Sequence, residues 1–225
     1  MNSAPPYFDA VLFDLDGVLT ATSALHAAAW KQTFDEVLDE PFDIERDYLA
    51  HVDGKPRLDG VRDLLRSRGI DAGEPAVREI AARKQALIER MLADGGVDAF
   101  PGSVRWVEQL RARGVRTAVV SSSTNSRAVL GAAGIDGLFE LTFDGRDAER
   151  LGLRGKPAPD GFLAAAALLG VEPRRAIVVE DALAGVAAGR AGAFGLVIGV
   201  ARGAAPDELL AAGADMVVGD LEELV

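Results

Sequence analysis

Short, continuous runs of apolar residues recur along this chain, and polar residues follow each run. The first spans residues 9–15 (DAVLFDL) and leads into Asp16 and Gly17. Later runs of the same kind occupy residues 116–120, 176–179 and 195–200, with a fainter one at 215–218. Strands of a parallel sheet are covered on both faces, so they consist of unbroken apolar runs rather than alternating ones. This pattern constrains the chain to an α/β fold.

Helical patterns separate these runs from about residue 97 onward. Apolar residues recur at helical spacing in residues 103–113, 125–134, 159–169 and 182–191. Strands that alternate with helices indicate a doubly wound parallel sheet with helices on both faces.

The stretch between the first run and the others has a different character, because it contains helical patterns and no convincing strand. One apolar stripe comprises Leu58, Val61, Leu64 and Leu65, and a second comprises Val77, Ile80, Leu87, Ile88 and Met91. We therefore predict an all-helical insert at residues 22–95, within a core formed by residues 1–21 and 96–225.

The net charge of the chain limits the kinds of molecule that it is expected to bind. Acidic residues number 35 and basic residues 24, which gives a net charge of −11. Such a surface repels phosphate backbones, so we expect neither nucleic acid nor an anionic membrane as a partner. An anionic substrate then requires local cations or a metal ion. Cysteine is absent from the sequence, which excludes disulfides and thiolate chemistry.

The N-terminal stretch does not resemble a signal peptide. It has no basic start, and Asp9, Asp14 and Asp16 interrupt its apolar residues. No apolar run approaches the length of a membrane span. We expect a soluble, cytoplasmic monomer.

Polar side chains follow four of the predicted strands, at the edge of a parallel sheet where ligands bind. Asp14 and Asp16 are two apart, so strand alternation places them on the same side. The other three segments are 121–125 (SSSTN), Lys156 and the pair Glu180-Asp181. Hard carboxylate oxygens suit Mg²⁺, whereas a lysine and hydroxyl groups suit phosphate oxygens.

These residues resemble the four motifs of the haloacid dehalogenase superfamily, in the same order along the chain. The resemblance rests on Asp14-x-Asp16-Gly17, Ser121, Lys156 and Glu180-Asp181, and it covers essentially the whole sequence. The dehalogenase branch lacks the second aspartate, so Asp16 implies phosphoryl transfer instead. The alternative is that these acids merely end strands.

The resemblance implies a role for each motif. Asp14 attacks phosphorus and forms an aspartyl phosphate, while Asp16 protonates the leaving oxygen and later deprotonates the acceptor. Asp14, the backbone carbonyl of Asp16 and Asp181 would hold Mg²⁺, with help from Glu180. The phosphoryl oxygens would be bound by Ser121, Ser122 and Lys156.

The helical insert resembles the substrate-selecting cap of the β-phosphoglucomutase branch. Thr22, His26 and Trp30 match the first cap helix of that branch, although His26 could simply be a packing histidine. Lys84 interrupts an apolar stripe, which suggests that its ammonium reaches the cleft. The alternative for Lys84 is an exposed position on a tilted helix.

A second phosphate site distinguishes a mutase from a phosphatase in this branch, because a bisphosphate must bind in two orientations. Arg57 matches the arginine of the cap loop, and Ser123 and Asn125 match its partners on the core. Scattered surface positions are the alternative for these three. Several residues depart from the branch pattern: Ala21, Asp53, Thr124 and Ala182.

The expected reaction is conversion of β-glucose 1-phosphate to glucose 6-phosphate, with a small phosphorylated sugar as substrate and Mg²⁺ as cofactor. The nearest alternative is a phosphatase that passes the phosphoryl group to water. A catalytically silent phosphosugar sensor is a third possibility, which the presence of both Asp14 and Asp16 disfavours. We expect the linkers at 19–23 and 94–100 to act as hinges for cap closure.

Overall fold

A six-stranded parallel sheet forms the centre of the protein in the computed structural model, which describes residues 8–225. The strand order is β3-β2-β1-β4-β5-β6, and every neighbouring pair is parallel. The strands are β1 (Ala10–Phe13), β2 (Arg116–Val120), β3 (Leu141–Phe143), β4 (Ala176–Glu180), β5 (Leu196–Val200) and β6 (Met216–Val218). The predicted doubly wound α/β fold is confirmed.

The central strand β1 shows why the apolar runs are continuous. Ala10 pairs with Arg116 of β2 on one side and with Ala176 of β4 on the other. All four residues of β1 are fully buried. Ala10 and Leu12 face one apolar cluster, while Val11 and Phe13 face a second cluster on the opposite side of the sheet. Both faces of the strand therefore require apolar side chains.

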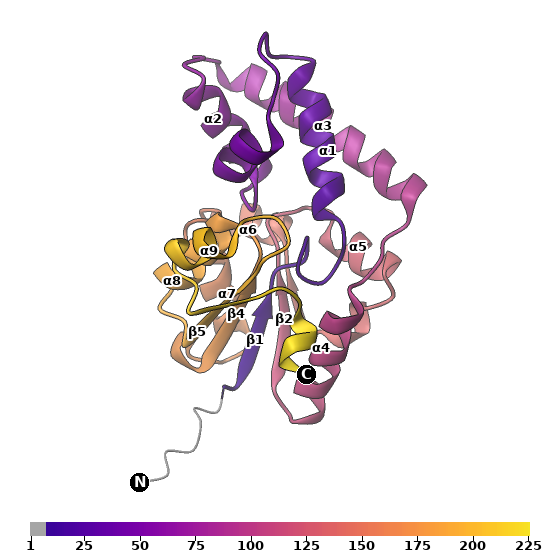
Figure 1. Ribbon diagram of the computed structural model, residues 1–225, viewed down its shortest axis with the longest axis vertical. Coiled ribbons are helices and arrows are strands. Elements are labelled where there is room, and N and C mark those ends of the chain that lie inside the picture. Colours follow the sequence, from indigo (N-terminus) through magenta and orange to yellow (C-terminus); the bar gives the residue numbers. More distant parts are fainter. Residues whose placement is uncertain (1–7) are drawn as a thin grey trace.

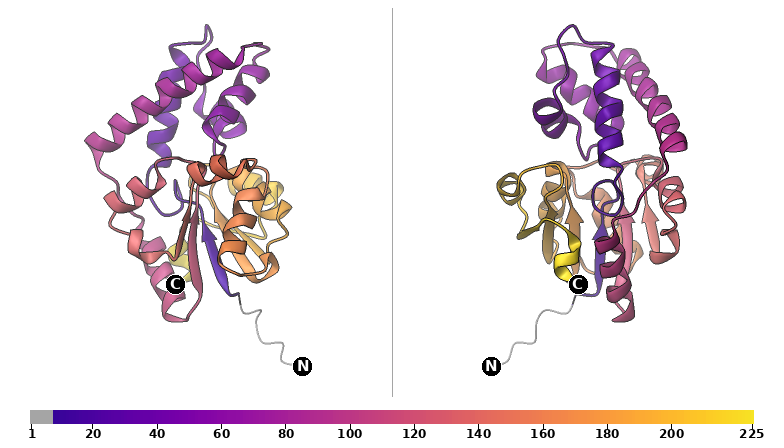
Figure 2. Two further views of the ribbon diagram at one scale, coloured as in Figure 1. Left: turned by 180° about the vertical axis from the view of Figure 1, so that it is seen from behind. Right: turned by 45° about the vertical axis from the view of Figure 1, so that its right-hand side comes forward.

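Helices cover both faces of the sheet (Figures 1 and 2). One apolar cluster receives side chains from α7 (Asp160–Leu168), α8 (Leu183–Ala191) and α9 (Pro206–Ala212). The other receives side chains from α4 (Pro101–Ala112) and α5 (Ser126–Ala132). A short helix, α6 (Gly145–Leu151), follows β3. None of the helices in the described part of the chain is both long enough and apolar enough to cross a membrane.

The regular structure of the insert, from α1 to α3, consists of helices, and no strand occurs in it. Its elements are α1 (Ser23–Asp35), η1 (Ile44–Val52), α2 (Arg57–Ser67) and α3 (Glu74–Gly95). They share an apolar core of their own, in which Phe34 stacks between Trp30 and Phe42 at centroid distances of 5.0 and 4.9 Å. The boundaries between core and cap, at residues 22 and 95, stay a prediction. The first seven residues of the predicted core lie outside the described range.

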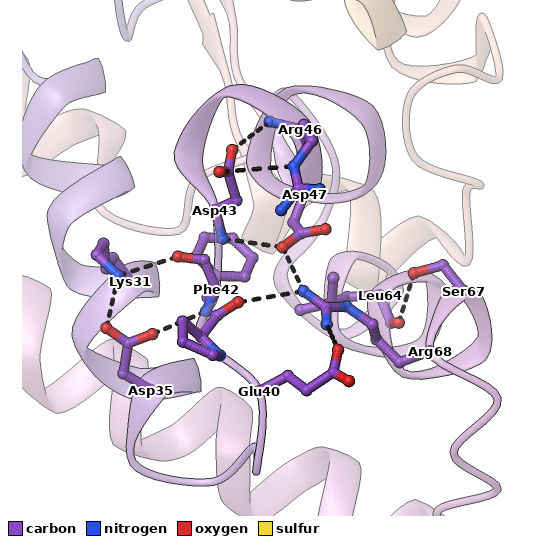
Figure 3. A network of polar contacts seen from close by, with 11 residues as sticks. Lys31, Asp35, Glu40, Phe42, Asp43, Arg46, Asp47, Leu64, Ser67 and Arg68 are labelled. Atoms are coloured by element: carbon purple, nitrogen blue, oxygen red, sulfur yellow. Dashed lines mark hydrogen bonds and ion pairs between the residues drawn. The ribbon is translucent and has the colours of Figure 1, made fainter.

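Polar contacts fix the loop between α1 and η1 (Figure 3). Arg68 at the end of α2 donates to Glu40 and to Asp47, at 2.7 and 2.6 Å. Lys31 donates to Asp35 and to the carbonyl of Phe42 at 2.7 and 3.0 Å. Each exposed pair contributes less than about 1 kcal/mol. Together they hold the approach to η1 in one conformation.

The two linkers to the helical insert pair with each other. The Ala21 N–H donates to the Asp98 carbonyl, and the Phe100 N–H donates to the Leu19 carbonyl, both at 2.9 Å. Thr20 and Ala99 form an antiparallel bridge between these two bonds. The insert therefore joins the core through two linkers that are hydrogen-bonded to each other as a short ladder, rather than through two separate loops.

Candidate active site

A cleft of about 1090 Å³ lies between the carboxyl edge of the sheet and the helical insert. Its lining includes residues that follow β1, β2 and β4, together with residues from η1, α2 and α3. Figure 2 shows the insert above the edge of the sheet at which these strands end. Ligand sites of open α/β sheets occupy this position.

Asp14 lies at the floor of the cleft beside a buried lysine. Lys156 donates to Asp14 Oδ1 at 2.5 Å and to the Val120 carbonyl at 3.2 Å. The same ammonium pairs with Glu180 Oε1 at 2.5 Å. Burial raises the pKa of Asp14 to about 6, although the Lys156 charge opposes this shift. The structure thus places three residues predicted from separate motifs in direct contact.

Three buried carboxylates converge in a manner suited to a divalent cation. Oxygen atoms of Asp14, Glu180 and Asp181 all lie within 4.8 Å of one another. Burial is the main cause that raises the pKa of Asp181 well above its usual value, and neighbouring carboxylates add to it. Such a cluster becomes favourable when a cation offsets the repulsion, so the donor set fits Mg²⁺.

Gly17 makes room for this cluster. Its φ is +87°, and a Cβ atom there would lie 1.8 Å from Asp181 Oδ2. Only glycine adopts this conformation without strain and also leaves space for the carboxylate. Gly17 is therefore part of the site, as the predicted Asp-x-Asp-Gly motif implied.

Asp16 turns away from the carboxylate cluster toward the first helix of the insert. Its side chain accepts a short hydrogen bond from Thr22 and lies 3.7 Å from His26 Nε2. Burial raises the pKa of Asp16, which favours the protonated form that a general acid needs. Its backbone carbonyl stays the predicted metal ligand.

His26 and Lys84 form a buried polar pair next to Asp16. Lys84 Nζ and His26 Nδ1 are 3.0 Å apart, and Lys84 lies 5.2 Å from the centroid of Trp30. Only 4% of Lys84 is exposed, so the alternative of an exposed helix position is wrong. The protonation states of His26 and Lys84 decide which of these two nitrogen atoms donates the hydrogen bond.

The serine loop after β2 contacts both the cleft and the insert. Ser121 is buried, and its Oγ accepts a hydrogen bond from the Ser123 N–H at 3.0 Å. Ser122 Oγ instead donates to the Gly54 carbonyl of the insert at 2.8 Å. Phosphate binding by Ser121 and Ser122 stays a prediction, and the Ser122 hydroxyl has a second role as a contact between core and insert.

The three residues predicted for a distal phosphate line the same cleft. Gln85 on α3 connects two of them, because Arg57 donates to its side-chain oxygen and its amide donates to Asn125 Oδ1 at 2.9 Å. Ser123 Oγ accepts from the Asn125 N–H at 3.1 Å. The structure therefore connects Arg57, Ser123 and Asn125 through hydrogen bonds within the lining of one cleft.

Three further residues contribute to this site. Gln85 follows Lys84 directly, but its link between Arg57 and Asn125 depends on how the insert sits on the core. Asp53 stood out as a departure from the branch pattern, and the structure places it in the lining of the cleft. Arg202, after β5, donates to the carbonyls of Gly17 and Val18 at 2.8 and 2.9 Å, and no sequence pattern signalled this role.

Comparison with known proteins places the chain in a family. The sequence model of haloacid dehalogenase-like hydrolases matches residues 8–192. A β-phosphoglucomutase of Mycobacterium tuberculosis is 46% identical over 98% of this chain and 93% of that protein. A β-phosphoglucomutase of Bacillus subtilis is 34% identical over 96% of this chain and 91% of its own length.

Solved structures with similar folds include both hydrolases and mutases. A hydrolase from Pseudomonas syringae has a TM-score of 0.84 at 26% identity and covers 96% of this chain and 95% of its own. A putative β-phosphoglucomutase from Bacteroides vulgatus has a TM-score of 0.83 at 26% identity, covering 97% and 86% respectively. With the ordered motifs and the sheet topology, these matches show that the chain belongs to the haloacid dehalogenase-like hydrolase family.

Proposed function

We propose that this protein is a magnesium-dependent β-phosphoglucomutase that interconverts β-glucose 1-phosphate and glucose 6-phosphate. The observation that carries this proposal is the presence of two sets of anion-binding groups in the lining of one cleft. Lys156 and Ser121 come from the core, and Arg57 comes from α2 of the insert. The 46% identity to a mycobacterial β-phosphoglucomutase over nearly the whole chain supports the same assignment.

In the first step, a carboxylate oxygen of Asp14 attacks the phosphorus of a bound bisphosphate. The bond from phosphorus to the sugar oxygen breaks, and Asp16 donates its proton to that oxygen. Lys156 and Ser121 stabilise the negative charge on the transferring group. Asp14, Glu180 and Asp181, with the carbonyl of Asp16, would hold Mg²⁺, which supplies further positive charge to the phosphoryl oxygens.

In the second step, the sugar monophosphate presents its other hydroxyl to the phosphorylated Asp14. Asp16 removes the hydroxyl proton as the new bond to phosphorus forms and the bond to Asp14 breaks. The remaining phosphate then needs a binding group at the far end of the cleft, and Arg57 supplies one. Ser123 and Asn125 are the proposed core partners of Arg57 at this end.

His26, Lys84, Trp30 and Thr22 have proposed supporting roles. Thr22 and His26 orient Asp16 through the contacts described above, so its proton points into the cleft. Lys84 adds positive charge near the substrate and is itself held over Trp30. Every one of these groups comes from a single chain, so we propose that a monomer is sufficient for activity. Freely diffusing sugar phosphates as substrates suit a cytoplasmic enzyme.

A phosphatase is the second candidate, and the acidic loop of the insert favours it. Asp53 adds a negative charge beside the cleft, where a bisphosphate with two anionic groups would have to turn. A monophosphate needs only the end of the cleft with Lys156 and Ser121. The two functions share every step up to the phosphorylated Asp14 and differ only in whether a sugar hydroxyl or water accepts the phosphoryl group.

The test is one incubation with Mg²⁺, β-glucose 1-phosphate and a trace of glucose 1,6-bisphosphate, in which glucose 6-phosphate and free phosphate are measured together. We expect glucose 6-phosphate to form without matching phosphate release. The variant Asp14→Asn controls for contaminating enzymes and should form neither product.

The variant Arg57→Ala separates the two candidates. It should reduce glucose 6-phosphate formation by roughly 10- to 100-fold, because a charged hydrogen bond is worth about 1.5–3 kcal/mol. Phosphate release as the main reaction, insensitive to Arg57→Ala, would establish the phosphatase instead.

A further inference from the structure

Asp53 stands at the point where the helical insert touches the catalytic loops of the core. It follows η1, and the next residue, Gly54, accepts a hydrogen bond from Ser122 at 2.8 Å. A Cβ atom on Gly54 would lie 2.8 Å from the Cβ of Ala182, directly after Asp181. The backbone beside Asp53 therefore lies against the loops that follow β2 and β4.

The end of η1 fixes the direction of this residue. The Asp53 N–H donates to the Tyr48 carbonyl at 2.8 Å, five residues back, so η1 closes in a wide helical turn. Wide turns of this kind are uncommon and often occur at functional sites. Gly54 then takes a φ of +69°, and Tyr48 lies close enough to Asp53 to oppose the rise in the pKa of its carboxyl group. Asp53 is thus held in place while the insert is docked.

The Asp53 carboxylate faces other acids. It lines the cleft together with Asp14, Asp16 and Asp181. Burial raises the pKa of Asp53 to about 6, and the charges of Glu180 and Asp16 raise it further, against the Tyr48 contact. Simple packing does not account for an additional acid here, because like charges in a buried site repel one another.

The chemistry of this position defines what it can bind. A carboxylate repels phosphate and accepts hydrogen bonds at several lone pairs. The neutral part of a phosphosugar carries hydroxyl groups and would occupy the same cleft as Asp53. A sugar hydroxyl is the natural donor to a carboxylate placed there.

We propose that Asp53 accepts a hydrogen bond from one ring hydroxyl of the bound sugar and thereby selects the sugar. The proposal rests on the phosphosugar function given above. It adds a residue of the insert that contacts the sugar ring, whereas Arg57, Lys156 and Ser121 contact phosphate groups. The backbone hydrogen bond from Asp53 to the Tyr48 carbonyl fixes the position of Asp53 at the end of η1. A site built to bind a hydroxyl discriminates strongly against an analogue that lacks it, because the buried acceptor is then left without a donor.

The experiment compares glucose 6-phosphate with its 2-, 3- and 4-deoxy analogues as inhibitors of acetyl phosphate hydrolysis. Acetyl phosphate is a phosphoryl donor without a sugar, so this readout does not depend on mutase turnover. The inhibition constant for each sugar is measured in the wild type and in the variants Asp53→Leu and Asp53→Asn. Asp59→Asn is the matched control, because Asp59 also lines the cleft but pairs with Arg62 on the exposed face of α2.

In the wild type, one deoxy analogue should bind roughly 10- to 100-fold more weakly than glucose 6-phosphate. Asp53→Leu should weaken glucose 6-phosphate by a similar factor and abolish the difference for that one analogue. Asp59→Asn should retain the wild-type pattern. Acetyl phosphate hydrolysis in Asp53→Leu reports that the variant is folded, and Asp53→Asn provides a second, isosteric test if leucine disrupts the fold.

Two results would overturn the proposal. If the Asp53 variants lose affinity equally for all four sugars, or for none, Asp53 has no role in reading the ring, and the mutase proposal is untouched. If no sugar phosphate inhibits the wild type although acetyl phosphate is hydrolysed, the phosphosugar function fails and the Asp53 proposal fails with it. If the sugars inhibit with the expected pattern but none is converted, only the mutase reaction is wrong.

Discussion

Lys84 is a buried cation whose charge the fold opposes. It is 4% exposed, and burial lowers its pKa from 10.5 to about 7, with Arg57 adding to the effect and Asp16 opposing it. The neighbouring His26 has a pKa well below its usual value, because burial and the Lys84 charge both disfavour a second positive charge. Lys84 therefore lowers the free energy of unfolding, and it places a positive charge close to the proposed substrate site.

This arrangement predicts how stability depends on pH. Between about pH 7 and 10.5 the unfolded chain holds a proton on Lys84 that the folded chain releases, so this residue makes stability rise with pH. Below pH 7 Lys84 is protonated in both the folded and the unfolded chain, so the full free-energy cost of burying its charge is present. Lys84→Met should raise the free energy of unfolding at pH 7 by about 1–3 kcal/mol, and this gain should shrink toward pH 9.5.

Urea unfolding at pH 7, 8 and 9.5 measures this difference. Arg83→Met is the matched control, because Arg83 is the preceding residue on α3, is exposed and pairs with Glu79. Its effect should stay within about 0.5 kcal/mol and should not change with pH. A Lys84→Met effect that is constant across this range would mean that the lysine is not held with a lowered pKa.

At the scale of single residues, the sequence predicted best where strand ends converge. Asp14, Asp16 and Asp181 follow strands β1 and β4 of one parallel sheet, so their proximity could be inferred from topology, whereas Lys156 reaches them from the loop between α6 and α7. Gln85 and Asp53 could not be found in this way, because they reach the cleft only through the packing of the insert on the core. Nothing in a local pattern encodes that packing.

The linkers and the loop after β1 form one connected element. Arg202 binds the carbonyls of Gly17 and Val18, pairs with Asp220 at 2.5 Å and lies 3.5 Å from the centroid of Phe100. Phe100 belongs to the second linker, and its N–H is bound to Leu19 of the first. Arg202 thus joins the catalytic loop to the ladder that carries the insert.

Replacing this arginine should affect Mg²⁺ binding more than folding. Arg202→Met removes the donors that hold the loop with the Asp16 carbonyl, a predicted metal ligand. The Mg²⁺ concentration for half-maximal activity should rise by roughly 10- to 100-fold, as is typical when the partners of metal ligands are lost. A magnesium titration of acetyl phosphate hydrolysis measures this shift.

Arg105→Met is the control for Arg202→Met. Arg105 is an exposed residue of α4 that pairs with Glu222 of the same C-terminal segment at 2.8 Å. Its magnesium titration should match the wild type. Equal shifts in both variants would indicate that Arg202 acts through general stability alone.

Strands and helices were predicted unevenly, for physical reasons. The continuous apolar runs gave β1, β2, β4, β5 and β6, with ends at most two residues away from the predicted ones. β3 was missed because it has only three residues, one of them Thr142, and α6 and α9 were missed because they are short and largely polar or exposed. Elements of this length draw their stability from neighbours rather than from their own pattern.

The whole molecule is in a closed arrangement. The insert contacts the core through Ser122 and Gly54, and again through Gln85 and Asn125. Gly155 lies against the insert as well, since a Cβ atom there would meet Pro56 at 1.8 Å. Because the linkers are paired in a ladder, we expect opening to be a rotation about that ladder rather than a free separation.

Small-angle scattering tests this motion. The radius of gyration should fall when Mg²⁺ and a sugar phosphate are added, because the ligand contacts both sides of the cleft. The double variant Ser122→Ala/Gln85→Ala removes these two hydrogen bonds and should be more expanded than the wild type without ligand. An identical radius in all three samples would mean that the cleft does not open and close about the linkers.

The position of β1 has a consequence for synthesis on the ribosome. This strand emerges first but lies between β2, about one hundred residues later, and β4, which is later still. Its neighbours do not yet exist when the helices from Ser23 to Gly95 leave the exit tunnel, and those helices contact mainly one another. The insert can therefore fold during translation, whereas β1 can pair with both of its neighbouring strands only after β4 has been synthesised.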